Sequence, residues 1–266
     1  MSVIKSIKTY VLGQLPHNQR DLVLATKRYS FFGEIHPKVQ QIIFLVDGKF
    51  YHGGFCDRLK GCISLFHYSL AKGIPFKIVY NYPFQLKDYL LPNEYDWLLN
   101  EEAVSDNFFD VRYMNLVGDG SAKRLIRLNT TKEIQCYANR DIVDELNMVY
   151  GANYRWGQLF KQLFKPTEKL AHLIKQHKTI IGGEYICAVY RFQNLLGDFP
   201  EYDFPELNDC EKEKLFDKMI QSIHQLLKNY NLQGIKQIIQ NQKDEQPHLY
   251  KERVIKKLKL NYFFDD

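Results

Sequence analysis

The sequence predicts an α/β fold, and three neighbouring segments carry that prediction. Residues 41–46 form a continuous apolar run that ends at Asp47-Gly48, as expected of a buried strand followed by a tight turn. Apolar residues then recur every three or four positions over 57–72, which indicates a helix, and 76–80 is a second apolar run. A strand, a helix and a strand in this order form a crossover unit with parallel strands.

Length and composition allow a sizeable core. The chain has 266 residues, of which 45% are hydrophobic, enough for one large domain or two modest ones. Its net charge is only +5, from 36 basic and 31 acidic residues, and no basic stripe with interleaved aromatic residues occurs. Such a balance is normal for a protein that binds small anionic molecules, and we expect no nucleic acid as a partner.

Cysteine usage and the apolar pattern predict the cellular location. The five cysteines are odd in number and lack paired short spacings, which indicates reduced thiols in a cytoplasmic protein. Residues 1–20 contain no secretory signal, and no span approaches the roughly 20 apolar residues that cross a bilayer. We expect a cytoplasmic protein, either soluble or held at the inner face of the membrane.

Weaker patterns beyond residue 98 predict two domains, residues 1–165 and 166–266. The apolar period stops over 178–183, where two adjacent glycines favour a linker. The further segments that we expect are strand-like pieces around Ile126 and over 134–137, helices over 155–164 and 167–176, a strand over 185–190, an amphipathic helix over 215–230, a strand over 235–239 and a basic helix over 248–259.

The most informative segment is 52–61, which reads His-Gly-Gly-Phe-Cys-Asp-Arg-Leu-Lys-Gly where the first strand gives way to the helix. Gly53 and Gly54 allow a ligand to approach the backbone, and the start of a helix offers free N–H groups to an anion. Asp57 is a candidate cap of that helix, and Arg58 a cation directed into the same crevice. The alternative is a tight turn with a capping aspartate and a solvated arginine.

A family resemblance adds to this motif. Together with Pro83-Phe84 and the sequence Leu-Pro-Asn-Glu-Tyr-Asp-Trp at 91–97, segment 52–61 resembles the N-terminal half of bacterial proteins related to nodulation-type α-fucosyltransferases. The resemblance implies two Rossmann-like domains that face a cleft, the GT-B arrangement. It also implies that the residues of the glycine turn bind a nucleotide sugar; they are Gly53, Gly54, Asp57 and Arg58.

The second segment, 188–199, places Arg191 at the end of an expected strand. The planar guanidinium suits a diphosphate because it donates two parallel hydrogen bonds, although a lone arginine is more often part of a salt bridge. Arg191 matches the arginine of a His-x-Arg-type motif in the superfamily. The resemblance therefore implies a catalytic role for Arg191, with Asn194 and Asp198 beside it in the nucleotide-sugar site.

Other candidates for the reaction are weaker. Glu201 and Asp203 are possible bases for an acceptor hydroxyl, although a solvated acidic loop is the commoner case. Most of the aromatic residues fit core patterns, and Trp97 and Trp156 are the first candidates for stacking on a sugar. No Asp-x-Asp motif and no histidine ligand spacing occurs, so we expect no metal and no cofactor besides the GDP-sugar donor.

The C-terminal part is short for a complete donor domain, and this leaves two functions open. The first is an inverting, metal-independent glycosyltransferase that moves fucose from GDP-fucose to a glycan hydroxyl, in polysaccharide or glycan biosynthesis. The alternative is a catalytically defective homologue that binds a glycan or a nucleotide. The basic helix expected over 248–259 either contacts an anionic membrane surface or is a solvated basic face.

Overall fold

The computed structural model describes residues 17–26, 28–32, 40–49, 52–99, 104–181, 195 and 205–229. The chain divides into two units, Met1–Ala171 and His172–Asp266, and each is considered by itself. The strands of the described residues all belong to the first unit.

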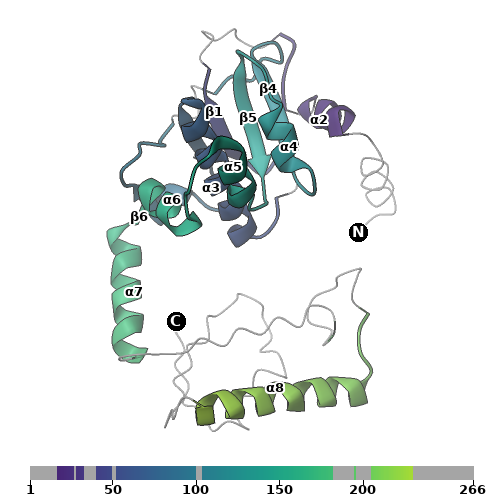
Figure 1. Cartoon of the computed structure of the whole chain (residues 1–266), viewed down its shortest axis with the longest axis vertical. Helices are drawn as coiled ribbons and strands as arrows, with labels where there is room; N and C mark the ends of the chain where they lie inside the picture. Colours follow the sequence, from purple (N-terminus) through teal and green to yellow (C-terminus); the bar gives the residue numbers. More distant parts are fainter. Residues whose placement is uncertain are drawn as a thin grey trace. The chain divides into compact units, whose positions relative to one another are not determined.

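A four-stranded parallel sheet forms the centre of the first unit (Figure 1). Its strands are β1 (Ile42–Val46), β2 (Phe76–Tyr80), β4 (Val111–Leu116) and β5 (Glu133–Ala138), in the order β2-β1-β5-β4. Every residue of β1 and β5 is buried, as expected of central strands that are covered on both faces. The α/β prediction is confirmed, and so are the two strands and the helix on which it was based.

Helices cover one face of this sheet. Helix α3 (Phe55–Lys72) contacts β1, β2 and β5, and α5 (Val143–Tyr150) packs against α3 (Figure 1). The even-numbered strand residues point to this face, and they include Phe44, Ile78 and Cys136 in one large apolar core. Two shorter helices, α4 (Ser121–Ile126) and α6 (Trp156–Leu163), contribute Leu125 and Leu159 to the same core.

The opposite face carries a buried polar network. Helix α2 (His17–Ala25) contacts β4, and the segment that follows it brings Tyr29 against Val111 and Tyr113. Gln135 of β5 is fully buried on this face, where its Oε1 accepts a hydrogen bond from the Tyr29 hydroxyl at 2.7 Å. Its amide nitrogen donates to the carbonyl of Ser105 at 2.8 Å. These bonds satisfy a polar side chain that would otherwise destabilise the core.

Two short strands form a separate antiparallel sheet. The pair consists of β3 (Leu90–Pro92) and β6 (Phe164–Pro166), and the short 3-10 helix η1 (Leu86–Asp88) precedes it. Trp97 is buried beside this pair and donates its indole N–H to the carbonyl of Leu163 at 2.8 Å. The indole is therefore a core group, and Trp97 is no longer a candidate for stacking on a sugar.

Two helices continue the chain. Helix α7 (Glu168–Ile181) crosses the division between the units, and α8 (Asp209–Asn229) lies in the second unit. Phe216, Met219 and Ile220 of α8 are buried together, which confirms the amphipathic helix predicted over 215–230. The strands expected over 185–190 and 235–239, and the helix over 248–259, lie outside the described residues.

Three local predictions differ from the structure. Ile126 ends helix α4 and is not in a strand, because Gly120 has a φ of 80° that starts the helix and Leu125 packs into the core. Helix α3 begins at residue 55 and not 57, since Gly54 is its N-cap. Helix α7 continues into the expected linker at 178–183, where the Thr179 hydroxyl donates to the carbonyl of Lys175 at 3.0 Å.

We predict that Gly61→Ala unfolds or severely destabilises the protein. A Cβ atom at Gly61 would lie 2.0 Å from the carbonyl oxygen of Ala138, because α3 crosses β5 with the two backbones almost in contact. Overpacking against backbone costs about 3 kcal/mol or more, because neither element can move aside without loss of core contacts. Urea denaturation measures the effect.

Gly157→Ala is the control for this prediction. A Cβ at Gly157 in helix α6 meets no atom within 4 Å, so the change should leave stability equal or slightly higher. Equal stability of Gly61→Ala and the wild type would contradict the close approach of α3 and β5.

Candidate functional site

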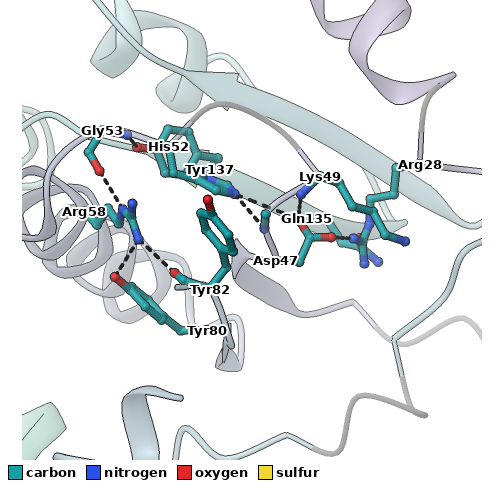
Figure 2. A network of polar contacts seen from close by, with 11 residues as sticks. Arg28, Asp47, Lys49, His52, Gly53, Arg58, Tyr80, Tyr82, Gln135 and Tyr137 are labelled. Carbon is teal, nitrogen blue, oxygen red and sulfur yellow. Dashed lines mark hydrogen bonds and ion pairs between the residues drawn. The ribbon is translucent and has the colours of Figure 1, made fainter. Parts of the chain in front are cut away.

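The candidate site lies where β1, β2 and β5 end, at the carboxyl edge of the parallel sheet. Ligands of α/β proteins bind at this edge because the loops that leave the strands surround a crevice there. Figure 2 shows the polar contacts at this edge. The carboxyl-edge site, as we use the term, comprises Asp47, His52, Gly53, Gly54, Arg58, Tyr80, Tyr82, Tyr137 and Asn139.

Arg58 is the central cation of this site. It is only 8% exposed, and its Nε donates to the carbonyl of Gly53 at 2.7 Å. Its Nη1 donates to the Tyr80 hydroxyl and to the carbonyl of Tyr82, both at 2.8 Å (Figure 2). Within the part of the chain that the structure describes, no carboxylate pairs with Arg58, and its Nη2 makes no hydrogen bond. A buried cation without a counter-charge is costly, and its position at a ligand-binding edge suits an anion.

The N-terminus of helix α3 lies beside this cation. The N-cap is Gly54, and among the described residues no side chain forms a capping hydrogen bond at the start of this 18-residue helix. Free N–H groups and the positive end of the helix dipole therefore face the same edge as Arg58. The expectation that Asp57 caps the helix is wrong: Asp57 is the third helical residue, and its carboxylate pairs with Lys60 at 3.1 Å.

The fold does not require glycine at the two positions before α3. Gly54 has φ −60° and ψ 158°, which any residue adopts, and Gly53 has no positive φ. A Cβ atom at Gly53 would lie 3.5 Å from the Tyr137 hydroxyl, and one at Gly54 would lie 3.7 Å from Asp57, both ordinary contacts. The described residues therefore leave room for a side chain at both positions, and glycine keeps the backbone accessible there.

Asp47 is a neutralised carboxylate at the same edge. It directly follows β1 and forms a buried ion pair with Arg28, and it also accepts a hydrogen bond from the backbone N–H of Lys49 at 3.1 Å. With both oxygens engaged, Asp47 is neither the missing counter-charge of Arg58 nor a free base.

His52 links the turn after β1 to the glycine pair. Its side chain is fully buried, and its Nε2 accepts a hydrogen bond from the N–H of Gly48 at 3.2 Å. Burial, and then the charge of Arg58, lowers the pKa of His52 from 6.5 to about 4. The imidazole is therefore neutral near pH 7, with its proton on Nδ1, and this buried nitrogen has no hydrogen-bond partner among the described residues.

The phenol of Tyr137 closes the site on the β5 side. Its oxygen accepts a hydrogen bond from the N–H of Gly53 at 2.7 Å, and burial raises the pKa of Tyr137, so the O–H group remains a donor. Oδ1 of the neighbouring Asn139 is buried and has no partner within the described part of the chain. The edge thus offers a fixed cation, helix N–H groups and spare hydrogen-bonding groups, a set that fits a phosphorylated, hydroxyl-bearing ligand.

The structure brings together four of the predicted site residues, Gly53, Gly54, Asp57 and Arg58. The other three, Arg191, Asn194 and Asp198, lie outside the described residues, and so do Glu201 and Asp203.

Sequence reasoning missed several residues of the carboxyl-edge site, namely Asp47, His52, Tyr80, Tyr82, Tyr137 and Asn139, and also Arg28, which pairs with Asp47. A usable signal existed for two of them, since Asp47 and Asn139 are the first residues after strands that end at this edge.

Within the described residues, no group of three or more histidine, cysteine, aspartate or glutamate side chains is arranged to hold a metal ion. The helices of that part of the chain include none that is both long enough and apolar enough to span a bilayer.

Comparisons with known proteins add one weak likeness. No family model matches the chain, and no curated protein matches it. Among solved structures, the chain is similar to a mutant of the fucosyltransferase FUT1 from Arabidopsis thaliana in complex with GDP, at a TM-score of 0.40 and 14% identity. The match covers 62% of this chain and 45% of that one, so the chain spans less than half of its length. A likeness at this level carries no argument about fold or function, which depend here on the residues themselves.

We predict that acidification from pH 6.5 to about 4 weakens the fold through His52. Its pKa is lower in the folded than in the unfolded protein, so the unfolded chain binds more protons in this window. The stability that neutral His52 contributes is therefore present above pH 6.5 and lost as the pH falls.

Urea denaturation of the wild type and His52→Gln at a series of pH values measures this loss. Glutamine keeps a hydrogen-bond acceptor but does not titrate, so the free energy of unfolding should fall more steeply with acid in the wild type. Parallel curves would show that His52 is not the buried neutral group described above.

Proposed function

We propose that the protein is a glycosyltransferase that uses a nucleotide sugar, and that the carboxyl-edge site binds the diphosphate of the donor. The observation that carries the proposal is the buried Arg58, which has no carboxylate partner among the described residues and lies beside an uncapped helix N-terminus. Nη2 and the first-turn N–H groups, which have no acceptor among the described residues, match two oxygens of a phosphate. The phosphate would supply the negative charge that these residues do not provide.

The reaction that we propose is a displacement at the anomeric carbon with inversion and without a metal ion. The acceptor oxygen forms a bond to that carbon while the bond to the diphosphate oxygen breaks, and the departing diphosphate takes the electron pair. The acceptor hydroxyl gives its proton to a base. Arg58 and the helix N–H groups lower the free energy of the departing anion because they are already oriented before the charge develops.

The donor, the acceptor and the domain arrangement that we propose follow from the sequence resemblance. We propose GDP-fucose as the donor, a glycan hydroxyl as the acceptor, and a GT-B arrangement in which residues 1–165 form the acceptor-side domain and 166–266 a short donor domain. Arg191 would neutralise the diphosphate from the donor side, with Asn194 and Asp198 beside it. The alternative is a catalytically defective homologue, which would bind the ligand without transferring the sugar. An assay of sugar transfer distinguishes the two functions.

We predict that Gly53→Ala and Gly54→Ala abolish GDP binding without loss of stability. Each methyl group fits the protein alone but occupies the space in which the phosphate would approach the backbone. Thermal unfolding with and without GDP measures binding, since a ligand at 100 times its dissociation constant stabilises the folded state by about 2.7 kcal/mol.

Gly157→Ala, on helix α6, is the matched control and should bind GDP as the wild type does. UDP and dTDP test the base specificity. If both turn variants bound GDP with wild-type affinity, the site would not hold the diphosphate.

For Arg191 we expect a loss of turnover without a matching loss of stability. If its guanidinium neutralises the departing diphosphate, Arg191→Ala should reduce kcat by roughly 10²–10³, the scale of one preorganised electrostatic contact. Arg191→Lys should recover only part of this, since lysine restores the charge but not the two parallel hydrogen bonds. Normal turnover with a lowered melting temperature would instead assign Arg191 a structural role.

A further inference from the structure

An exposed row of aromatic rings begins at the carboxyl-edge site. Phe55, the residue after Gly54, lies 5.6 Å from Phe84 between ring centroids, and Phe84 lies 5.2 Å from Tyr89. Phe55 is 40% exposed, Tyr89 is 41% exposed, and Phe84 is half-buried between them. We call these three residues the aromatic strip. Phe84 packs against the core, whereas Phe55 and Tyr89 leave large ring surfaces exposed to solvent.

The strip is physically continuous with the cation of the site. The ring of Phe84 lies 5.4 Å from the ring of Tyr80, and the guanidinium of Arg58 lies 5.6 Å from the centre of that same Tyr80 ring. The Tyr80 hydroxyl also accepts a hydrogen bond from Arg58. A ligand on the strip would therefore lie next to a group bound at Arg58.

The strip is preorganised. The Phe84 and Tyr89 rings meet edge to face at 78°, and the Phe55 and Phe84 rings are tilted by 59°, so each ring lies against the next. The backbone carbonyl of Tyr89 accepts a hydrogen bond from Thr167 at 2.9 Å, which fixes the far end. Rings held in this way lose little conformational freedom when a ligand binds.

We infer that the aromatic strip binds a neutral carbohydrate, the acceptor of the proposed transfer. The inference deepens the proposed function and rests on it for the identity of the acceptor. Sugars present apolar faces of C–H groups that stack on aromatic rings, and the tilted rings offer a stepped surface to successive sugar units. Lys87 and Asp88, which precede Tyr89 in the sequence, are exposed and opposite in sign, so they add no net charge to this segment, which favours an uncharged ligand.

The size of the strip argues against a protein partner. Two rings about 40% exposed and one half-buried ring present on the order of 200 Å², whereas a stable protein interface buries about 800 Å² on each partner. A few sugar units match this area. Carbohydrate is thus the occupant that fits both the area and the chemistry.

Affinity electrophoresis of the full chain in native gels tests the inference. The gels contain soluble neutral polysaccharides of the glucan, mannan and galactan types, and at least one of them should retard the wild type. Phe55→Ala and Tyr89→Ala should each weaken that retardation about tenfold, as expected for the loss of one stacked ring. Phe55→Leu keeps the apolar bulk without the ring face and should be impaired as well.

Phe32→Ala is the matched control. Phe32 is 98% exposed and makes no ring contact with the strip, so its removal should change neither retardation nor stability. The thermal shift with GDP, measured on Tyr89→Ala and Phe32→Ala, should remain as in the wild type because Tyr89 is at the end of the strip away from Gly54 and Arg58.

The two measurements separate the two claims. Retardation that depends on Phe55 and Tyr89, without any GDP binding, would remove the proposed function and leave the strip as a carbohydrate site. Binding of GDP without retardation by any polysaccharide, or equal retardation of the strip variants and the wild type, would overturn the inference.

Discussion

The guanidinium of Arg58 holds three segments of the carboxyl edge together. It donates to the carbonyl of Gly53 before α3, to the hydroxyl of Tyr80 at the end of β2, and to the carbonyl of Tyr82 in the loop that follows. These partners are neutral, so they fix the position of the cation without removing its charge. One side chain thus connects the glycine turn, the end of β2 and the loop after β2.

The two arginines near the edge, Arg28 and Arg58, differ in whether a carboxylate pairs with them. Asp47 is neutralised by Arg28, which belongs to the segment on the opposite face of the sheet, whereas the described residues hold no counter-charge for Arg58. Asp57 adds a negative charge nearby, but it is half-exposed and paired with Lys60, so solvent and the lysine screen it. The buried part of the edge is therefore positive.

Three glycines of one short segment serve different physical ends. Gly61 is required by packing, because the backbone of β5 leaves no room for a side chain where α3 crosses it. Gly53 and Gly54 have ordinary backbone angles, and a Cβ atom at either position would make only ordinary contacts, so packing does not require glycine there. Packing thus requires glycine at residue 61, whereas at residues 53 and 54 glycine leaves the backbone accessible.

The sequence alone determined the β1–α3–β2 unit, the glycine turn and the amphipathic helix α8, because their patterns repeat within a few residues. It did not predict α4 at Ile126, the strand β4 or the start of α3, where caps and burial decide. Only the tertiary structure joined Arg28 to Gln135, 107 residues apart, and Gly53 to Tyr137, 84 residues apart. Such contacts depend on which strands become neighbours in the sheet. The local periodicity of the sequence does not determine this strand order.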